Sequence, residues 1–159
     1  MSLKMSLKMN STQCLHDEDL NTMKFVVAGE IVGKGRPRFT RSGRTYTPKR
    51  TADYERTIKT AYLNKYSYLS QKALRIKIIA YLKVAKSHSN IKKQKMLANE
   101  LQCTKKPDID NITKVVLDAL NKVAYEDDTQ IVEVASIKRW ATEDKLVVVI
   151  DELGKTMKQ

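Results

Sequence analysis

Hydrophobic residues recur along the chain with two spacings, which predict an alternation of strands and helices. Alternating or β-branched apolar residues predict strands over four segments: 25–32, 74–84, 129–140 and 145–151. Apolar residues at three- and four-residue steps predict helices over 51–66 and, after Pro107, over a segment whose apolar stripe runs from Ile112 to Val123. This order predicts an α+β fold, a small single domain with a mixed β-sheet and two main helices.

The N-terminus and one internal segment have weaker patterns. Residues 1–22 contain the tetrapeptide MSLK twice, at 1–4 and 5–8, and then polar residues. We interpret them as a disordered tail or an artificial addition, which leaves 23–155 as the folded domain. The lysine-rich segment 87–100 is polar and compatible with a short surface helix.

Composition narrows the class of protein. The chain has 159 residues, of which 42% are hydrophobic, too many for a wholly disordered polycation. No apolar run approaches the ~20 residues that span a bilayer, so we expect a soluble, cytoplasmic protein without a membrane partner. Cys14 and Cys103 form no disulfide framework and are expected to be reduced. The net charge of +12 indicates a polyanionic partner, either nucleic acid or an acidic membrane surface.

The positive charge is concentrated between Gly33 and Arg50, where no acidic residue occurs. We predict a loop or a loosely paired hairpin that binds DNA phosphates, with Phe39 and Tyr46 as surfaces for base stacking. A merely solvated basic loop is the alternative. Seven cations are the candidate DNA-binding residues: Lys34, Arg36, Arg38, Arg41, Arg44, Lys49 and Arg50.

Acidic residues gather around the second predicted helix. Asp108 and Asp110 are two apart in a segment predicted to be extended, so their carboxylates can project to the same side. Lys114 follows one helical turn later, and Asp127 and Asp128 lie before the next strand. If that strand pairs beside the helix N-terminus, three carboxylates and one ammonium group converge.

Such carboxylates repel one another unless a cation compensates them. Oxygen donors without cysteine or histidine support favour Mg²⁺, or Mn²⁺, and this arrangement suits phosphodiester hydrolysis. The structural alternative is that each aspartate only caps a helix or marks a turn. The remaining candidates show no zinc-binding spacing and are taken as non-catalytic: His16, His88, Cys14 and Cys103.

Three sequence motifs surround the acidic residues: Lys-Pro-Asp-Ile-Asp-Asn-Ile-Thr-Lys at 106–114, Leu-Asp-Ala-Leu at 117–120 and Tyr-Glu-Asp-Asp-Thr-Gln-Ile at 125–131. Together they resemble the signature of the RusA-type Holliday junction resolvases. The upstream segment Gly-Arg-Pro-Arg-Phe at 35–39 also resembles phage and prophage members of that family. The likeness covers approximately residues 24–151.

The resemblance implies a homodimeric, Mg²⁺-dependent endonuclease that resolves four-way DNA junctions by paired symmetric nicks in recombination and repair. It implies that Asp108, Asp110 and Asp128 are the catalytic, metal-binding carboxylates and that Lys114 is the essential lysine. Asp128 is preferred to Asp127 because it precedes the x-Gln-Ile sequence. Two alternatives remain, a non-catalytic module that binds branched DNA and a nuclease that acts on other branched DNA.

Overall fold

The computed structural model describes residues 21–154 and confirms an α+β fold with one mixed sheet. Residues 1–20 of the expected tail lie outside the described residues, and Thr22 already belongs to the first strand. Besides the two main helices that the sequence predicts, the structure contains a third, short helix. The elements in chain order are β1 (Thr22–Ala28), β2 (Arg38–Phe39), β3 (Thr45–Tyr46), α1 (Lys49–Leu63), β4 (Leu74–Lys83), α2 (Asn90–Leu97), α3 (Ile109–Leu120), a 3-10 turn (Asp128–Gln130), β5 (Ile131–Ala141) and β6 (Lys145–Glu152).

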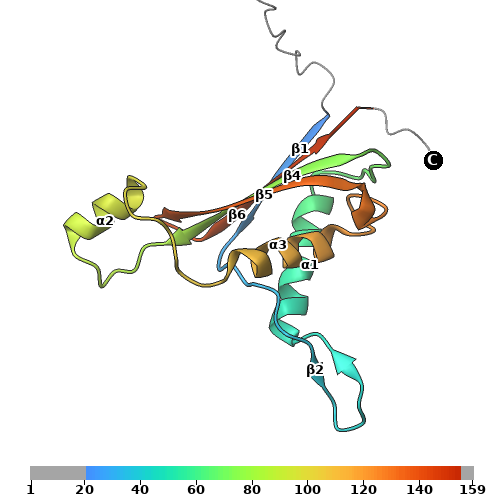
Figure 1. The fold of residues 1–159 in the computed structure, drawn as a ribbon, viewed down its shortest axis with the longest axis horizontal. Coiled ribbons are helices and arrows are strands. Elements are labelled where there is room, and N and C mark those ends of the chain that lie inside the picture. The colour runs from blue at the N-terminus through green and yellow to red at the C-terminus, as the bar shows by residue number, and fades with distance from the viewer. Residues whose placement is uncertain (1–20, 155–159) are drawn as a thin grey trace, which may run out of the picture.

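The main sheet has the strand order β1-β6-β4-β5. The β1–β6 and β6–β4 pairs are antiparallel, whereas β4 and β5 are parallel. A parallel pair needs a crossover connection, and here the crossover contains α2 and α3. Helices α1 and α3 lie on one face of the sheet, and α2 lies beyond one end of it (Figure 1). The short β2–β3 hairpin projects away from this body.

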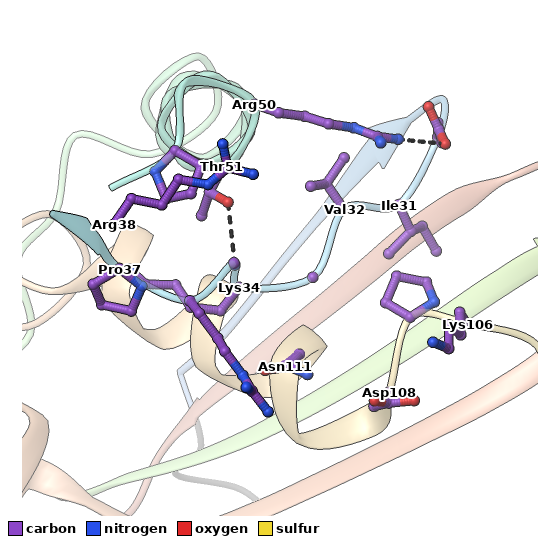
Figure 2. A pocket seen from close by; sticks show the side chains of 16 residues that line it. Ile31, Val32, Lys34, Pro37, Arg38, Arg50, Thr51, Lys106, Asp108 and Asn111 are labelled. Carbon is purple, nitrogen blue, oxygen red and sulfur yellow. Dashed lines mark hydrogen bonds and ion pairs between the residues drawn. The ribbon is translucent and has the colours of Figure 1, made fainter. Parts of the chain in front are cut away.

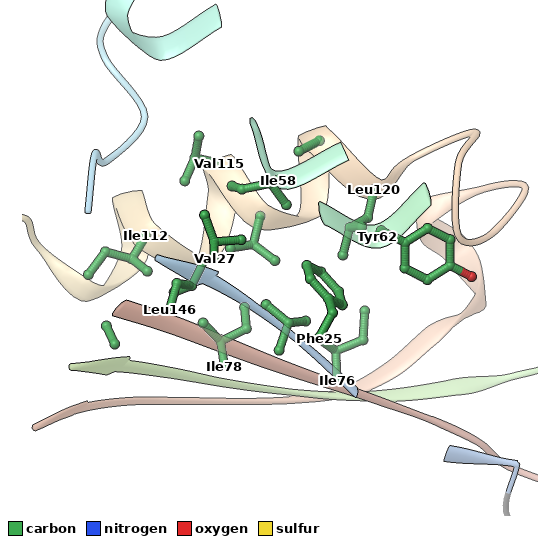
Figure 3. Packing of buried hydrophobic residues seen from close by; sticks show 14 of the residues in the cluster. Phe25, Val27, Ile58, Tyr62, Ile76, Ile78, Ile112, Val115, Leu120 and Leu146 are labelled. Atoms are coloured by element: carbon green, nitrogen blue, oxygen red, sulfur yellow. The ribbon is translucent and has the colours of Figure 1, made fainter. Parts of the chain in front are cut away.

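The core lies between the sheet and the pair α1 and α3 (Figure 3). Helix α3 buries the predicted apolar stripe, which comprises Ile112, Val115, Val116, Ala119 and Leu120. Because this stripe fixes the rotation of α3, the residues on its other side are exposed to solvent. Those exposed residues are Asp110, Lys114 and Asp118.

The first strand is shorter than the sequence predicts. It ends at Ala28 instead of residue 32, because Gly29 adopts φ 97° and its N–H donates to the carbonyl of Asp144 at 3.0 Å. A positive φ of this size is readily adopted only by glycine. Ile31 is nevertheless buried, and the segment after it runs towards the N-termini of α1 and α3, where Lys34 and Gly35 make hydrogen bonds.

A buried carboxylate closes the sheet at the end of β6. The side chain of Glu152 is 1% exposed and accepts hydrogen bonds from Tyr68 Oη at 2.8 Å, Ser70 Oγ at 2.6 Å and Lys72 Nζ at 2.8 Å. Burial by itself would raise the pKa of Glu152, but the hydrogen bonds from Lys72, Ser70 and Tyr68 outweigh burial and lower it. Glu152 therefore connects the segment before β4 to the last strand.

We expect Glu152→Gln to lower the free energy of unfolding at pH 7 by about 1–3 kcal/mol, the usual cost of disturbing a buried hydrogen-bonded group. Because the folded pKa is lowered, this contribution is present above the ordinary glutamate pKa of 4.5 and is lost as the pH falls through the folded value. Urea unfolding at pH 7 and pH 3 measures both effects. The exposed Glu133→Gln is the matched control, and an equal loss at both pH values would contradict this role.

Candidate active site

The N-terminus of α3 presents the first two aspartates. Asp108 is the N-cap residue with extended backbone (φ −70°, ψ 149°), and Asp110 lies in the first helical turn. The prediction of an extended segment is therefore confirmed for Asp108 and wrong for Asp110, because the helix already begins at Ile109. The Asp108 side chain accepts no capping hydrogen bond, and both aspartates are exposed. Their carboxylates are thus accessible to a ligand.

Three hydrogen bonds hold this helix end against β5. Lys138 Nζ donates to the carbonyls of Lys105 at 2.7 Å and Pro107 at 3.1 Å. One turn into α3, the hydroxyls of Thr113 and Ser136 lie 2.6 Å apart in a hydrogen bond. The segment that carries the aspartates is therefore fixed to a strand of the main sheet.

A cavity of about 600 Å³ lies between α3 and β5. Asp110, Lys114 and Asp128 line it, so three of the four predicted catalytic residues share one cavity. Asp118, which the sequence analysis did not select, lines it as well. Asp108 instead lines an adjoining cavity of about 570 Å³ together with Asp110.

The donor groups of this region suit a hard cation. Within residues 21–154, no three side chains of His, Cys, Asp or Glu lie close enough to form a preformed metal cluster. Asp110 and Asp128 nevertheless share a cavity, and in this part of the chain neither has a basic nitrogen within 4.0 Å. Two carboxylates without a basic partner fit Mg²⁺ or Mn²⁺, since Mg²⁺ keeps several waters and needs few protein ligands.

Asp127 and Asp128 differ in their environments. Asp127 caps the 3-10 turn, and its carboxylate accepts from the N–H of Thr129 at 2.9 Å, which lowers the pKa of Asp127. Asp128 lines the cavity and lies beside the hydroxyl of Tyr125. Burial raises the pKa of Tyr125, and the charge of Asp128 raises it further. The cap interpretation thus describes Asp127, whereas Asp128 faces the same cavity as Asp110.

The basic loop forms the predicted hairpin, with Arg38 opposite Tyr46 and Phe39 opposite Thr45. Gly43 adopts φ 77° at the tip. Phe39 is 74% exposed and Tyr46 is 45% exposed, so both rings are accessible. Within residues 21–154, five of the seven predicted DNA-binding cations have no carboxylate within 4.0 Å: Arg36, Arg38, Arg41, Arg44 and Lys49.

The other two cations are paired. Arg50 contacts Glu30 at 2.6 Å on the surface. Lys34 contacts both Glu55 and Asp118 at 2.6 Å, and its side chain is 17% exposed. Burial alone would lower the pKa of Lys34, but the bonds to Asp118 and Glu55 outweigh burial and raise it. Sequence reasoning could not find these partners, since they lie 21 and 84 positions away (55 − 34 and 118 − 34).

A cationic cavity of about 680 Å³ connects the hairpin with Asp108 (Figure 2). Its charged lining residues are five cations and two carboxylates: Lys34, Arg36, Arg38, Arg50, Lys106, Glu30 and Asp108. Asp108 lies at its boundary and also lines the cavity that contains Asp110. A polyanion held by the cations of the first cavity would therefore lie beside the aspartates of α3.

The segment between β1 and the hairpin passes very close to both helices. A Cβ atom at Gly33 would lie 2.9 Å from Cβ of Pro107 and 3.0 Å from Cβ of Asn111. A Cβ atom at Gly35 would lie 2.9 Å from Oγ1 of Thr51. These glycines allow the chain to pass between α1 and α3.

Cys103, which the sequence analysis sets aside as non-catalytic, lines the cavity that contains Asp108 and Asp110. Cys103 is buried and free, and Trp140 packs against the core. Cys14 and His16 lie outside the described residues. Within residues 21–154, no helix has the length and apolar content to cross a membrane.

The exposed carboxylates lie beside a cationic cavity and a cationic hairpin, an arrangement that suits the hydrolysis of a phosphodiester. The family described as Endodeoxyribonuclease RusA matches residues 28–151. The chain therefore belongs to the RusA endodeoxyribonuclease family, an enzyme class of Holliday junction resolvases that hydrolyse phosphodiester bonds. The uncharacterized protein YqaN of Bacillus subtilis (strain 168) is 33% identical over 141 residues, which cover 85% of this chain and 99% of that protein.

We expect Gly33→Ala to lower the free energy of unfolding by about 1–3 kcal/mol, because the added methyl group would overlap with Pro107 and Asn111. Cleavage should fall as well, since relief of the overlap moves the start of α3. Thermal unfolding and a cleavage assay measure the two effects. Gly154→Ala is the matched control because a Cβ there meets no atom of residues 21–154 within 4 Å. Equal behaviour of the two variants would contradict the close packing.

Proposed function

We propose that the chain resolves four-way DNA junctions by Mg²⁺-dependent, paired symmetric nicks. The observation that carries this proposal is the shared cavity of Asp110, Lys114 and Asp128 next to the cationic cavity that reaches Asp108. Membership of the RusA family supplies the reaction class. The dependence on Mg²⁺, the symmetry of the nicks and the roles of individual residues are what the experiments below test.

Asp108, Asp110 and Asp128 would hold the cation, which is Mg²⁺ or alternatively Mn²⁺. When bound, it would neutralise phosphate charge and activate water for hydrolysis. Lys114 lies one helical turn beyond Asp110 on the same cavity. Its ammonium group would bind a phosphate oxygen and stabilise the charge that develops during cleavage.

The hairpin and the cationic cavity would hold the DNA. Guanidinium groups bind phosphate oxygens with two parallel hydrogen bonds, and four of the five unpaired cations in this region are arginines. Phe39 and Tyr46 are exposed among them and offer faces on which unpaired bases at a branch point can stack. These contacts position the DNA without reading its sequence.

We propose that the enzyme acts as a homodimer. In the part of the chain described, the sheet face opposite α1 and α3 has no helix over it (Figure 1). The strand register aligns four apolar residues across this face, one from each strand: Val26, Val147, Ile79 and Ile137. A second copy would cover this row, and two-fold symmetry would present two sites to the two opposing strands of a junction.

We expect Asp110→Asn to lower the cleavage rate of a four-way junction by at least about a hundredfold, more than the loss from removing a supporting group of a metal site. Junction affinity should remain nearly unchanged, because the cationic surface is intact. Mobility shift and cleavage are measured on one preparation, with and without Mg²⁺. Asp127→Asn is the matched control, since asparagine keeps the cap.

End labels on two opposing DNA strands of the junction test, in the same experiment, whether the nicks are symmetric. Nicks on both strands at equivalent positions support the dimer, and nicks on one strand contradict it. A linear duplex and a three-way branch separate junction cutting from general branch cutting. Junction binding without cleavage by the wild-type protein in Mg²⁺ would identify a non-catalytic module.

We expect Arg38→Gln to reduce the salt dependence of junction binding by about one unit in the slope of log Kd against log salt concentration, since one phosphate contact is lost. Arg56→Gln on α1 is the matched control, because Arg56 is an exposed arginine paired with Asp53 at 3.2 Å. Equal slopes for the two variants would contradict phosphate binding by the hairpin.

A further inference from the structure

Lys114 and Asp118 stand four residues apart on the exposed side of α3, where oppositely charged side chains ordinarily pair. They do not pair here. Oδ2 of Asp118 lies 2.6 Å from Nζ of Lys34. Within residues 21–154, no carboxylate oxygen lies within 4.0 Å of Lys114. Because Lys34 pairs with Asp118, Lys114 of the candidate active site has no carboxylate partner in this part of the chain.

Backbone hydrogen bonds hold Lys34 next to Asp118. The N–H of Lys34 donates to the carbonyl of Asn111 at 2.9 Å, and the N–H of Gly35 donates to Oγ1 of Thr51 at 3.2 Å. Lys34 Nζ also donates to Glu55 at 2.6 Å. With a mostly buried side chain and two carboxylate partners, Lys34 is a poor candidate for phosphate binding, unlike the free arginines of the hairpin.

The charges along the cavity explain why this pairing matters. Asp110, Asp118 and Asp128 line the cavity with Lys114 as the only cation among its lining residues. An unpaired Asp118 would capture Lys114 and would repel a phosphate group. The pairing with Lys34 removes both effects.

We propose that Lys34 is a positioning residue: by holding Asp118, it keeps Lys114 free to contact the phosphate that is cleaved. This inference rests on the proposed function and replaces the predicted role of Lys34 in DNA binding. Lys34 acts through Asp118 and Lys114 and does not touch the substrate.

Three variants separate positioning from the other roles of a lysine. We expect Lys34→Met to lower kcat by roughly tenfold while junction affinity and its salt dependence stay near the wild-type values. A phosphate-binding role would instead weaken affinity and lower the salt slope. The double variant Lys34→Met/Asp118→Asn should recover most of kcat, because the competing carboxylate is gone. If Lys34 were only an anchor, the double variant would cleave no better than the single variant.

Lysine acetylation followed by mass spectrometry gives a readout that needs no activity. We expect Lys34→Met to slow the labelling of Lys114 several-fold relative to the exposed Lys92 on α2, and the double variant to restore it. Unchanged labelling of Lys114 in Lys34→Met would overturn the proposal even if cleavage fell. A shift in labelling in a protein that cleaves no DNA would uphold the positioning and reject the proposed function instead.

Lys59→Met is the matched control for removing a lysine, and it should leave both cleavage and the labelling of Lys114 unchanged. Circular dichroism confirms the fold of each variant. If Lys34→Met does not fold, Lys34→Gln takes its place, because glutamine keeps a donor for Glu55 and removes the charge. The same outcomes then decide the proposal.

Discussion

The close passage of residues 33–35 between the N-termini of α1 and α3 is the constraint on which the candidate site depends. A side chain at Gly33 would overlap with Pro107 and Asn111, so this approach requires glycine. The segment leads directly into the cationic hairpin, while Pro107 precedes the aspartates of α3. One packing contact therefore sets the distance between the surface that would hold DNA and the carboxylates that would cleave it.

The core and the main sheet fix the position of α3, which carries the aspartates. The buried stripe of α3 fixes which residues face outwards, and the bonds from Lys138 and Ser136 fix the helix along β5. Because β4 and β5 are parallel, their crossover must return along the sheet, which places α3 over it. The exposed aspartates do not form a tight cluster without metal, so the fold avoids most of the repulsion of like charges.

Local periodicity predicts the parts of the structure that depend on local physics. The stripe on α3 and the spacing of Asp110 and Lys114 follow from the 3.6-residue repeat, and both residues line one cavity. The early end of β1 could not be predicted, since it depends on the conformation of Gly29 and a hydrogen bond to Asp144. The separation of Asp108 from Asp128 likewise depends on where the helix begins and on tertiary packing.

Lys34 shows why a count of cations overstates a DNA-binding surface. From the sequence alone, Lys34 and Arg38 are equally good candidates for DNA binding, since both lie in the same segment without acidic neighbours. In the fold, Arg38 is exposed without an acidic partner within reach in the described residues, whereas two carboxylates from α1 and α3 surround the ammonium group of Lys34. A buried charge persists only where it is paired, so the partners determine its role. The cations available for phosphate are those for which the tertiary structure supplies no carboxylate.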